Sequence, residues 1–372
     1  MQLSSPKEPS GILGWFASTL GRIVVSVIVP LITFLVMWQV FIFLRDSDAP
    51  KIVIVLVAII WGVGGVALLF LVTNWVVEQL PPHWTTTLQP FVFIGPAIAI
   101  MGWFLAIPVL RTLALSFQDA LSQNWVGFRN YIFAFTDPRM LETFRNNLLW
   151  MVLGTFFSVG LGLLIAVLAD RSKYESIYKS IIFMPMAISF VGAGVIWKFM
   201  YTYRGIGVGI EEIGLLNAIV LAFGGVPQPW LSIPPWNNLF LIAIMIWLQT
   251  GFAMVVISSA IKGVPSELLE AGRIDGANEI QSFFKITIPY IRGTLITVTT
   301  TIIIFSLKLF DIVRVMTAGN NGTNVIANEF YLQRFTYQDT GKASAIAIIL
   351  LIAVVPVIWN NLREFNKDRR AF

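Results

Sequence analysis

Apolar runs long enough to cross a lipid bilayer recur along almost the whole chain, and this feature limits its fold more than any other. A spanning helix needs about 20 mostly apolar residues, because the hydrocarbon core of a bilayer is about 30 Å thick. Only 12% of the 372 residues are charged and 57% are hydrophobic, whereas about a quarter of a soluble domain is charged. We therefore expect an all-α integral membrane protein with about eight transmembrane helices, at residues 20–44, 52–77, 91–116, 148–169, 180–201, 239–261, 295–315 and 343–359.

Four prolines lie inside these predicted spans, namely Pro96, Pro108, Pro185 and Pro356. Proline removes a backbone hydrogen bond, and neighbouring helices can satisfy the group that it frees. We expect kinks at these positions.

The distribution of Lys and Arg predicts the orientation of the spans. An even number of spans places both termini on one side, and the segments on that side carry more Lys and Arg than those on the other. Such an excess is typical of the cytoplasmic face. We expect both termini in the cytoplasm, and the polar first residues show no cleavable signal peptide.

A polar break after the second span, EQLPPHWTTTLQP, divides the chain. Its two prolines should stop a helix. We expect three parts: an N-terminus with two accessory transmembrane helices (1–88), a six-span core with a polar loop at about 262–292 (89–362), and a cytoplasmic tail (363–372).

Composition excludes several function classes. The net charge is +5, but no basic cluster carries interleaved aromatic residues, so we expect no nucleic-acid partner. The chain has no Cys and a single His, and the spans offer no carboxylate pair or nucleophile triad. We therefore expect no catalytic residues and no metal site.

The polar loop contains ELLEAGRIDGANEIQSFFKITIPY, with six charged side chains and two glycines. We expect a short helix over 265–273, a stop at Gly276, and a second helix capped by Asn278 with Gln281 as its capping-box partner. One interpretation is an amphipathic hairpin that only connects two spans at the membrane surface. Against it, Gly272 costs about 1 kcal/mol relative to Ala inside a helix, and three acids would face an anionic leaflet. Docking into another protein explains both features better.

The spacing within this loop resembles that of one transporter family. Glu270-Ala271-Gly272, then Gly276 after three residues, then Ile286, Ile288 and Pro289 after nine more are similar to the cytoplasmic loop of ABC importer permeases, the inner-membrane components of binding-protein-dependent transport. That family has Ala where Gly272 stands and Leu where Ile288 stands. The stretches PMAISFVGAGVIWKFMY and WLQTGFAMVVISSAIKGVP resemble the α-glucoside and glucosylglycerol permeases, and the resemblance covers about 91–362.

The resemblance implies a multi-pass protein of the bacterial inner membrane that imports a sugar by alternating access. The implied partners are a second homologous permease, a cytosolic ABC ATPase dimer, an extracytoplasmic sugar-binding protein, the sugar and membrane lipid. This chain would bind no cofactor, since ATP and Mg²⁺ belong to the ATPase subunit; the sequence contains no phosphate-binding G-x-x-x-x-G-K-[ST] motif. The implied coupling residues are Glu267, Glu270, Ala271, Gly272, Asp275, Gly276 and Pro289.

The resemblance also implies a substrate pathway through the core. Alignment with the maltose permease places it at Met186, Phe190, Met245, Leu248, Gln249, Phe252, Ile302, Ser306 and Leu309. We take Met186, Phe190, Leu248, Gln249, Phe252 and Ser306 as the candidate pathway residues. Polar and aromatic side chains inside spans suit a sugar, although Gln249 could equally join two helices.

Lys308, Asp311 and Arg314 recur every three residues in the seventh span, so on a continuous helix they share one side. We expect a mutually paired cluster, and a gate at the outer mouth is a further hypothesis. An ion-coupled secondary transporter with Asp311 as the carrier is the alternative function, but it gives no reason for the polar loop.

Overall fold

The computed structural model describes residues 19–79, 82–205 and 212–368. The first 18 residues of the predicted cytoplasmic N-terminus and the last four of the predicted tail lie outside these ranges. The chain divides into two compact units, Met1–Val109 and Leu110–Phe372. This division lies inside the third predicted span, and the functional division at residue 88 stays a prediction.

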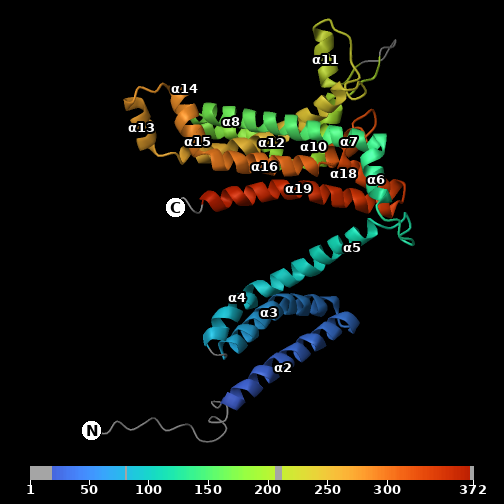
Figure 1. The fold of residues 1–372 in the computed structure, drawn as a ribbon, viewed down its shortest axis with the longest axis vertical. Coiled ribbons are helices and arrows are strands. Elements are labelled where there is room, and N and C mark those ends of the chain that lie inside the picture. Colours follow the sequence, from blue (N-terminus) through green and yellow to red (C-terminus); the bar gives the residue numbers. More distant parts are fainter. Residues whose placement is uncertain (1–18, 80–81, 206–211, 369–372) are drawn as a thin grey trace. The chain divides into compact units, whose positions relative to one another are not determined.

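Three long helices, followed by a π turn at Gly102–Ala106, make up most of the described part of the first unit (Figure 1). α2 (Thr19–Asp46) packs against α3 (Lys51–Glu78), which packs against α4 (Pro82–Met101). α3 ends at Glu78, and Pro82 stands at the first position of α4, where its missing N–H leaves no helical hydrogen bond unmade. Most apolar side chains of α2 and α3 are exposed, as expected for surfaces that face lipid.

The second unit is a helical bundle whose long members run side by side (Figure 1). They are α8 (Thr155–Asp170), α12 (Trp236–Lys262), α16 (Arg292–Leu307) and α19 (Thr340–Asp368). α8 extends α7 (Pro138–Leu149) through a π turn at Trp150–Gly154, and Asp137 caps α7 by accepting a hydrogen bond from Arg139 N. α5 (Ile107–Leu115) and α6 (Arg129–Thr136) precede α7, whereas α11 (Leu215–Ala222) and α18 (Ile326–Tyr331) lie in the connections before α12 and before α19.

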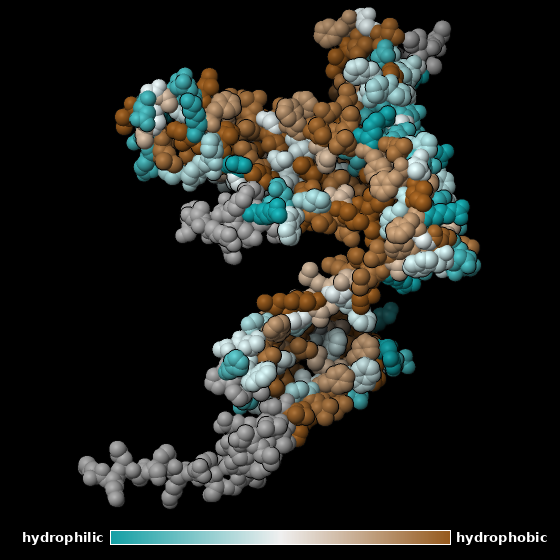
Figure 2. All heavy atoms as spheres, in the orientation of Figure 1, coloured by the Kyte–Doolittle hydropathy of each residue, from teal (hydrophilic) through white to brown (hydrophobic). Residues whose placement is uncertain are grey.

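The core of this unit forms around α12. Leu241, Ile244, Met245, Met254 and Ile257 on α12 are fully buried and belong to one apolar cluster with residues of α8, α10, α16 and α17. Figure 2 shows apolar side chains over the sides of the bundle and hydrophilic ones towards its two ends. This distribution fits a unit that crosses a bilayer.

Two of the predicted spans are broken. The fifth comprises α9 (Glu175–Phe183), a 3₁₀ turn at Met184–Ala187 and α10 (Phe190–Met200), with a bend of 102°. Pro185 lies at the break, and Ser189 starts α10 afresh by accepting a hydrogen bond from Gly192 N at 3.1 Å.

The seventh span also departs from a single straight helix. The segment Glu279–Tyr290 meets α16 at 69°, and α16 ends at Leu307, before α17 (Asp311–Met316). Within the described residues, six helices are long and apolar enough to cross a membrane, and the count reaches eight when each bent pair is one span. The predicted all-α membrane fold is confirmed.

Candidate functional site

The first candidate site is the polar loop, which folds as α13 (Ser266–Ile274), α14 (Glu279–Ser282), a π turn at Phe283–Thr287 and α15 (Ile288–Tyr290). We call these elements the loop helices. α13 ends one residue later than predicted, and Gly276 follows at φ +80°, a conformation that glycine adopts without strain. Asn278 Oδ1 accepts a hydrogen bond from Gln281 N at 2.8 Å, and Gln281 Oε1 accepts one from Asn278 N at 3.0 Å. The predicted capping box is present.

Gly272 is buried where α13 packs against the π turn. A Cβ at this position would lie 2.5 Å from Ile286 Cδ1. The glycine therefore lets the loop helices approach closely. The contacted atom is the end of a flexible side chain. A small shift of Ile286 would therefore make room for alanine, the residue that ABC importer permeases have at this position.

The outer surface of the loop helices exposes both charged and apolar groups. Ile274, Ile280 and Phe284 are 86%, 70% and 64% exposed, and the predicted coupling residues other than Gly272 are also exposed, namely Glu267, Glu270, Ala271, Asp275, Gly276 and Pro289. Exposed apolar side chains framed by charges at a polar end of a bundle are typical of a protein-binding surface.

One ion pair joins the loop helices to the bundle, and a second joins α13 to α14. Glu279 lies 3.0 Å from Arg171, which follows α8, and 3.2 Å from Arg273 of α13. These two pairs are exposed, so each contributes little to stability.

A less exposed ionic cluster lies on the bundle nearby. Lys179 of α9 contacts Asp170 of α8 at 2.5 Å, Glu175 at 2.6 Å, and the Ser258 hydroxyl of α12. Only 17% of the Lys179 side chain is exposed. One lysine thus links the ends of three helices.

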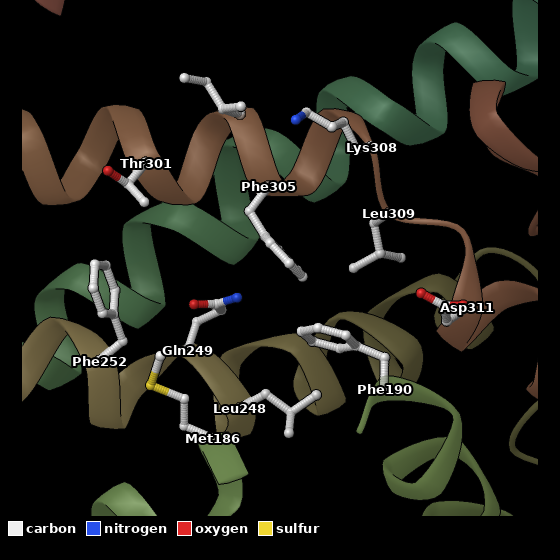
Figure 3. A pocket seen from close by; sticks show the side chains of 11 residues that line it. Met186, Phe190, Leu248, Gln249, Phe252, Thr301, Phe305, Lys308, Leu309 and Asp311 are labelled. Carbon is white, nitrogen blue, oxygen red and sulfur yellow. The ribbon is translucent and has the colours of Figure 1, made fainter. Parts of the chain in front are cut away.

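The second candidate site is a half-open cavity of about 570 Å³ in the bundle (Figure 3). It lies where the breaks of the fifth and seventh spans face α12. Five of the six predicted pathway residues line it, although their predicted role stays a prediction. The lining consists of Met186, Phe190, Leu248, Gln249, Phe252, Thr301, Ile304, Phe305, Lys308, Leu309 and Asp311.

Ser306 is the predicted pathway residue that does not line the cavity. Its side chain is buried and its hydroxyl donates to Ile303 O at 2.8 Å. α16 instead presents Thr301, Ile304, Phe305 and Lys308, a set spaced as one helical face. This face could have been found in the sequence. Phe305, Ile304 and Thr301 precede the charged Lys308 by the spacings that place residues on one side of a helix.

Aromatic rings and an amide shape the cavity wall. The Phe190 and Phe305 ring centroids are 4.7 Å apart with 37° between the ring planes. The Gln249 amide extends into the space between α12 and Phe305 (Figure 3). The cavity thus combines apolar ring faces with a group that can both donate and accept hydrogen bonds.

The prediction of one continuous helical side carrying Lys308, Asp311 and Arg314 is wrong. Lys308 N bonds to Phe305 O at 3.1 Å and Leu309 N to Ser306 O at 3.3 Å, so the last turn tightens and α16 stops. Asp311 begins α17, and both it and Lys308 line the cavity.

Arg314 lies elsewhere, with its guanidinium carbon 4.4 Å from the Tyr331 ring centroid. In the described ranges no ion pair joins any two of these three residues, so the expected mutual pairing is also wrong.

A multi-pass bundle with broken spans beside a cavity, and short exposed helices at one end, is typical of a membrane transporter. Residues 158–366 match the model of one family, described as binding-protein-dependent transport system inner membrane component. The chain belongs to this family.

Curated relatives cover most of the chain. The osmoprotective compounds uptake permease protein GgtC of Synechocystis is 56% identical over 278 residues, which are 75% of this chain and 99% of that protein. The alpha-glucoside transport system permease protein AglF of Rhizobium meliloti is 47% identical over 283 residues, covering 76% of this chain and 84% of that protein.

A solved structure shares the fold. One chain of a bacterial alginate ABC transporter, in complex with an alginate pentasaccharide-bound periplasmic protein, aligns with a TM-score of 0.64 at 20% identity, over 76% of this chain and 94% of that chain. At this identity the likeness concerns the fold alone.

Proposed function

We propose that this chain is the transmembrane permease subunit of an ATP-driven, binding-protein-dependent sugar importer, with neutral α-glucosides of the sucrose, trehalose or glucosylglycerol type as its substrates. The identity to the permeases for osmoprotective compounds and for alpha-glucosides is the observation that carries this proposal. The binding-protein dependence of the family disfavours the ion-coupled carrier.

The loop helices face the cytosol in this proposal and dock with an ABC ATPase dimer, and both termini lie on the same side. Their exposed carboxylates and apolar side chains supply the contact surface, and the turn at Gly276 fixes the angle between α13 and α14. ATP and Mg²⁺ bind to the ATPase subunits, so this chain performs transport and its partner performs hydrolysis. A second homologous permease and an extracytoplasmic sugar-binding protein complete the assembly.

The cavity beside α12 is the substrate pathway. Phe190 and Phe305 offer ring faces to a pyranose, and Gln249 offers hydrogen bonds to hydroxyls. Met186, Leu248 and Phe252 also line it, while Ser306 supports α16 from behind the lining.

Purification in a gentle detergent from the native membrane tests the proposal. Co-purifying proteins are identified by mass, and the eluate is assayed for ATPase activity. We expect a nucleotide-binding subunit, and at least a tenfold loss of it in a Glu270→Arg, Gly276→Pro double variant. Proline requires φ near −65° and cannot adopt the +80° of Gly276.

Gly276→Pro alone should insert normally in the membrane but uncouple ATP hydrolysis from uptake. Glu142→Gln, which removes a carboxylate outside the loop helices, is the control and should retain the ATPase. Recovery of this chain alone, without ATPase activity, would contradict the proposal, as would full assembly and uptake in the double variant.

A further inference from the structure

We propose that Lys308 and Asp311 are specificity-determining residues of the cavity, and that this oppositely charged pair makes it select neutral polyhydroxylated substrates over acidic ones. The inference rests on the proposed function and deepens it. It assigns a role to two charges that the pathway prediction did not include.

The break in the seventh span brings both charges to the cavity. Lys308 follows the last turn of α16, and Asp311 begins α17 after two further residues outside the helices. Both residues belong to the lining, and they come from separate helical segments. The Asp311 carboxylate points towards Leu309 and Phe190, whereas the Lys308 side chain extends back along α16 (Figure 3). Unwound backbone at membrane depth is tolerated where it is buried in protein or lines a cavity.

These two residues are the charged members of a lining that is otherwise apolar apart from Gln249 and Thr301. None of the ion pairs among the described residues contains Lys308 or Asp311. A charge in a membrane-spanning region is costly and marks a substrate or ion path when it faces a cavity. Two charges facing one cavity without pairing are therefore available to a ligand.

Hydroxyl groups suit this arrangement. A hydroxyl can accept a hydrogen bond from the Lys308 ammonium and another can donate one to the Asp311 carboxylate, and such charge-assisted bonds are stronger than neutral ones. The Phe190 and Phe305 rings provide an apolar surface on the same cavity, and its volume of about 570 Å³ lies within the usual range for small-molecule sites.

An acidic sugar experiences both attraction and repulsion in the same cavity. Its carboxylate would be attracted to Lys308 but repelled by Asp311, while losing its hydration. A neutral sugar uses both groups at once. The net neutrality of the pair therefore favours neutral substrates.

Equilibrium binding to the complete importer in lipid nanodiscs, without the extracytoplasmic binding protein, tests this assignment. The probe is radiolabelled sucrose, displaced by trehalose or by a disaccharide that contains glucuronic acid. We expect Asp311→Asn to weaken sucrose binding at least tenfold and to improve competition by the acidic disaccharide, relative to trehalose, by at least tenfold. Lys308→Met should weaken sucrose binding without this gain.

Matched controls remove the same charges elsewhere in the second unit. Lys198→Met and Glu142→Gln should leave both affinities unchanged, and Asp311→Glu should keep the preference for the neutral sugar. A purely structural role would weaken all ligands alike, so an unchanged ratio of acidic to neutral affinity in Asp311→Asn would overturn the inference.

The wild-type importer separates this inference from the proposed function. If the wild-type importer binds sucrose and the variants keep the same preference for neutral over acidic disaccharides, only the assignment of Lys308 and Asp311 is overturned. Failure of the wild-type assembly to bind or transport either neutral sugar would overturn the proposed function itself.

Discussion

α12 and the fifth span differ in construction although both cross the second unit. α12 is one helix of 27 residues, and more than half of its most apolar stretch is buried. The fifth span is two helices joined by a 3₁₀ turn with a bend of 102°. The continuous helix supports the core. At the break in the fifth span, Met186 between α9 and α10 lines the cavity instead.

The seventh span follows the fifth in this respect. Its helix α16 ends inside the bundle, and α17 packs against α10. Gly194 of α10 makes this contact close, since a Cβ there would lie 3.0 Å from Val315 Cγ1. The C-terminal halves of two broken spans thus form a pair, and the cavity lies beside their breaks.

The largest expected loss of stability comes from disrupting the contact between α8 and α12. A Cβ at Gly162 would lie 2.5 Å from Ala253 Cβ and 2.9 Å from Met254 N. Because backbone cannot move aside as a side chain can, Gly162→Leu should cost about 3 kcal/mol or more. Size-exclusion chromatography after heating should show loss of the monodisperse protein.

Gly160→Leu is the control for this contact, since a Cβ there has no atom within 4 Å apart from its chain neighbours and the nearby backbone of its own helix. Equal loss in both variants would show that leucine on α8, and not the close contact with α12, causes the effect. The supporting role assigned to α12 would then be wrong.

The next effect concerns the link between the broken fifth span and the continuous helices. Lys179→Met keeps most of the side-chain length but removes the ion pairs to Asp170 and Glu175. Charge-assisted hydrogen bonds contribute about 1.5–3 kcal/mol when buried, and partial exposure reduces this, so we expect a loss of about 1–2 kcal/mol. Thermal unfolding in nanodiscs measures it.

Lys173→Met removes an exposed lysine from the same connection and should leave the unfolding temperature unchanged. If Lys179→Met also has no effect, α9 is held to α8 and α12 by apolar packing alone.

The smallest effect is at the start of α10. Ser189→Ala removes the acceptor for Gly192 N and should cost about 1 kcal/mol, as for other helix caps. Ser189→Asn keeps an acceptor and should restore stability in the same thermal assay. A larger loss of stability in Ser189→Asn than in Ser189→Ala would mean that side-chain size at the break matters more than capping.

Local signals predicted much of the fold and part of the site. The length of the apolar runs located the spans, and Pro185 predicted a kink in the fifth span. Asn278 with Gln281 predicted the cap of α14. Each of these rests on interactions between residues close in sequence. The cavity residues Met186, Phe190, Leu248, Gln249 and Phe252 came from the resemblance to known permeases.

The break after Leu307 could not be predicted in this way. Residues 308–310 are Lys-Leu-Phe, with neither proline nor glycine to stop a helix. Helical periodicity therefore continued through them, and the expected pairing of Lys308, Asp311 and Arg314 followed from a helix that is not there.

The sequence by itself determined that this chain is a helical membrane protein with a structured polar loop, because bilayer thickness and helix capping act on short stretches of chain. Only the tertiary structure decided which face of α16 meets the cavity, and that Lys308 and Asp311 reach it while Arg314 stacks on Tyr331. Those outcomes depend on packing between segments far apart in sequence, where α10 meets α17 and α12 supports both broken spans.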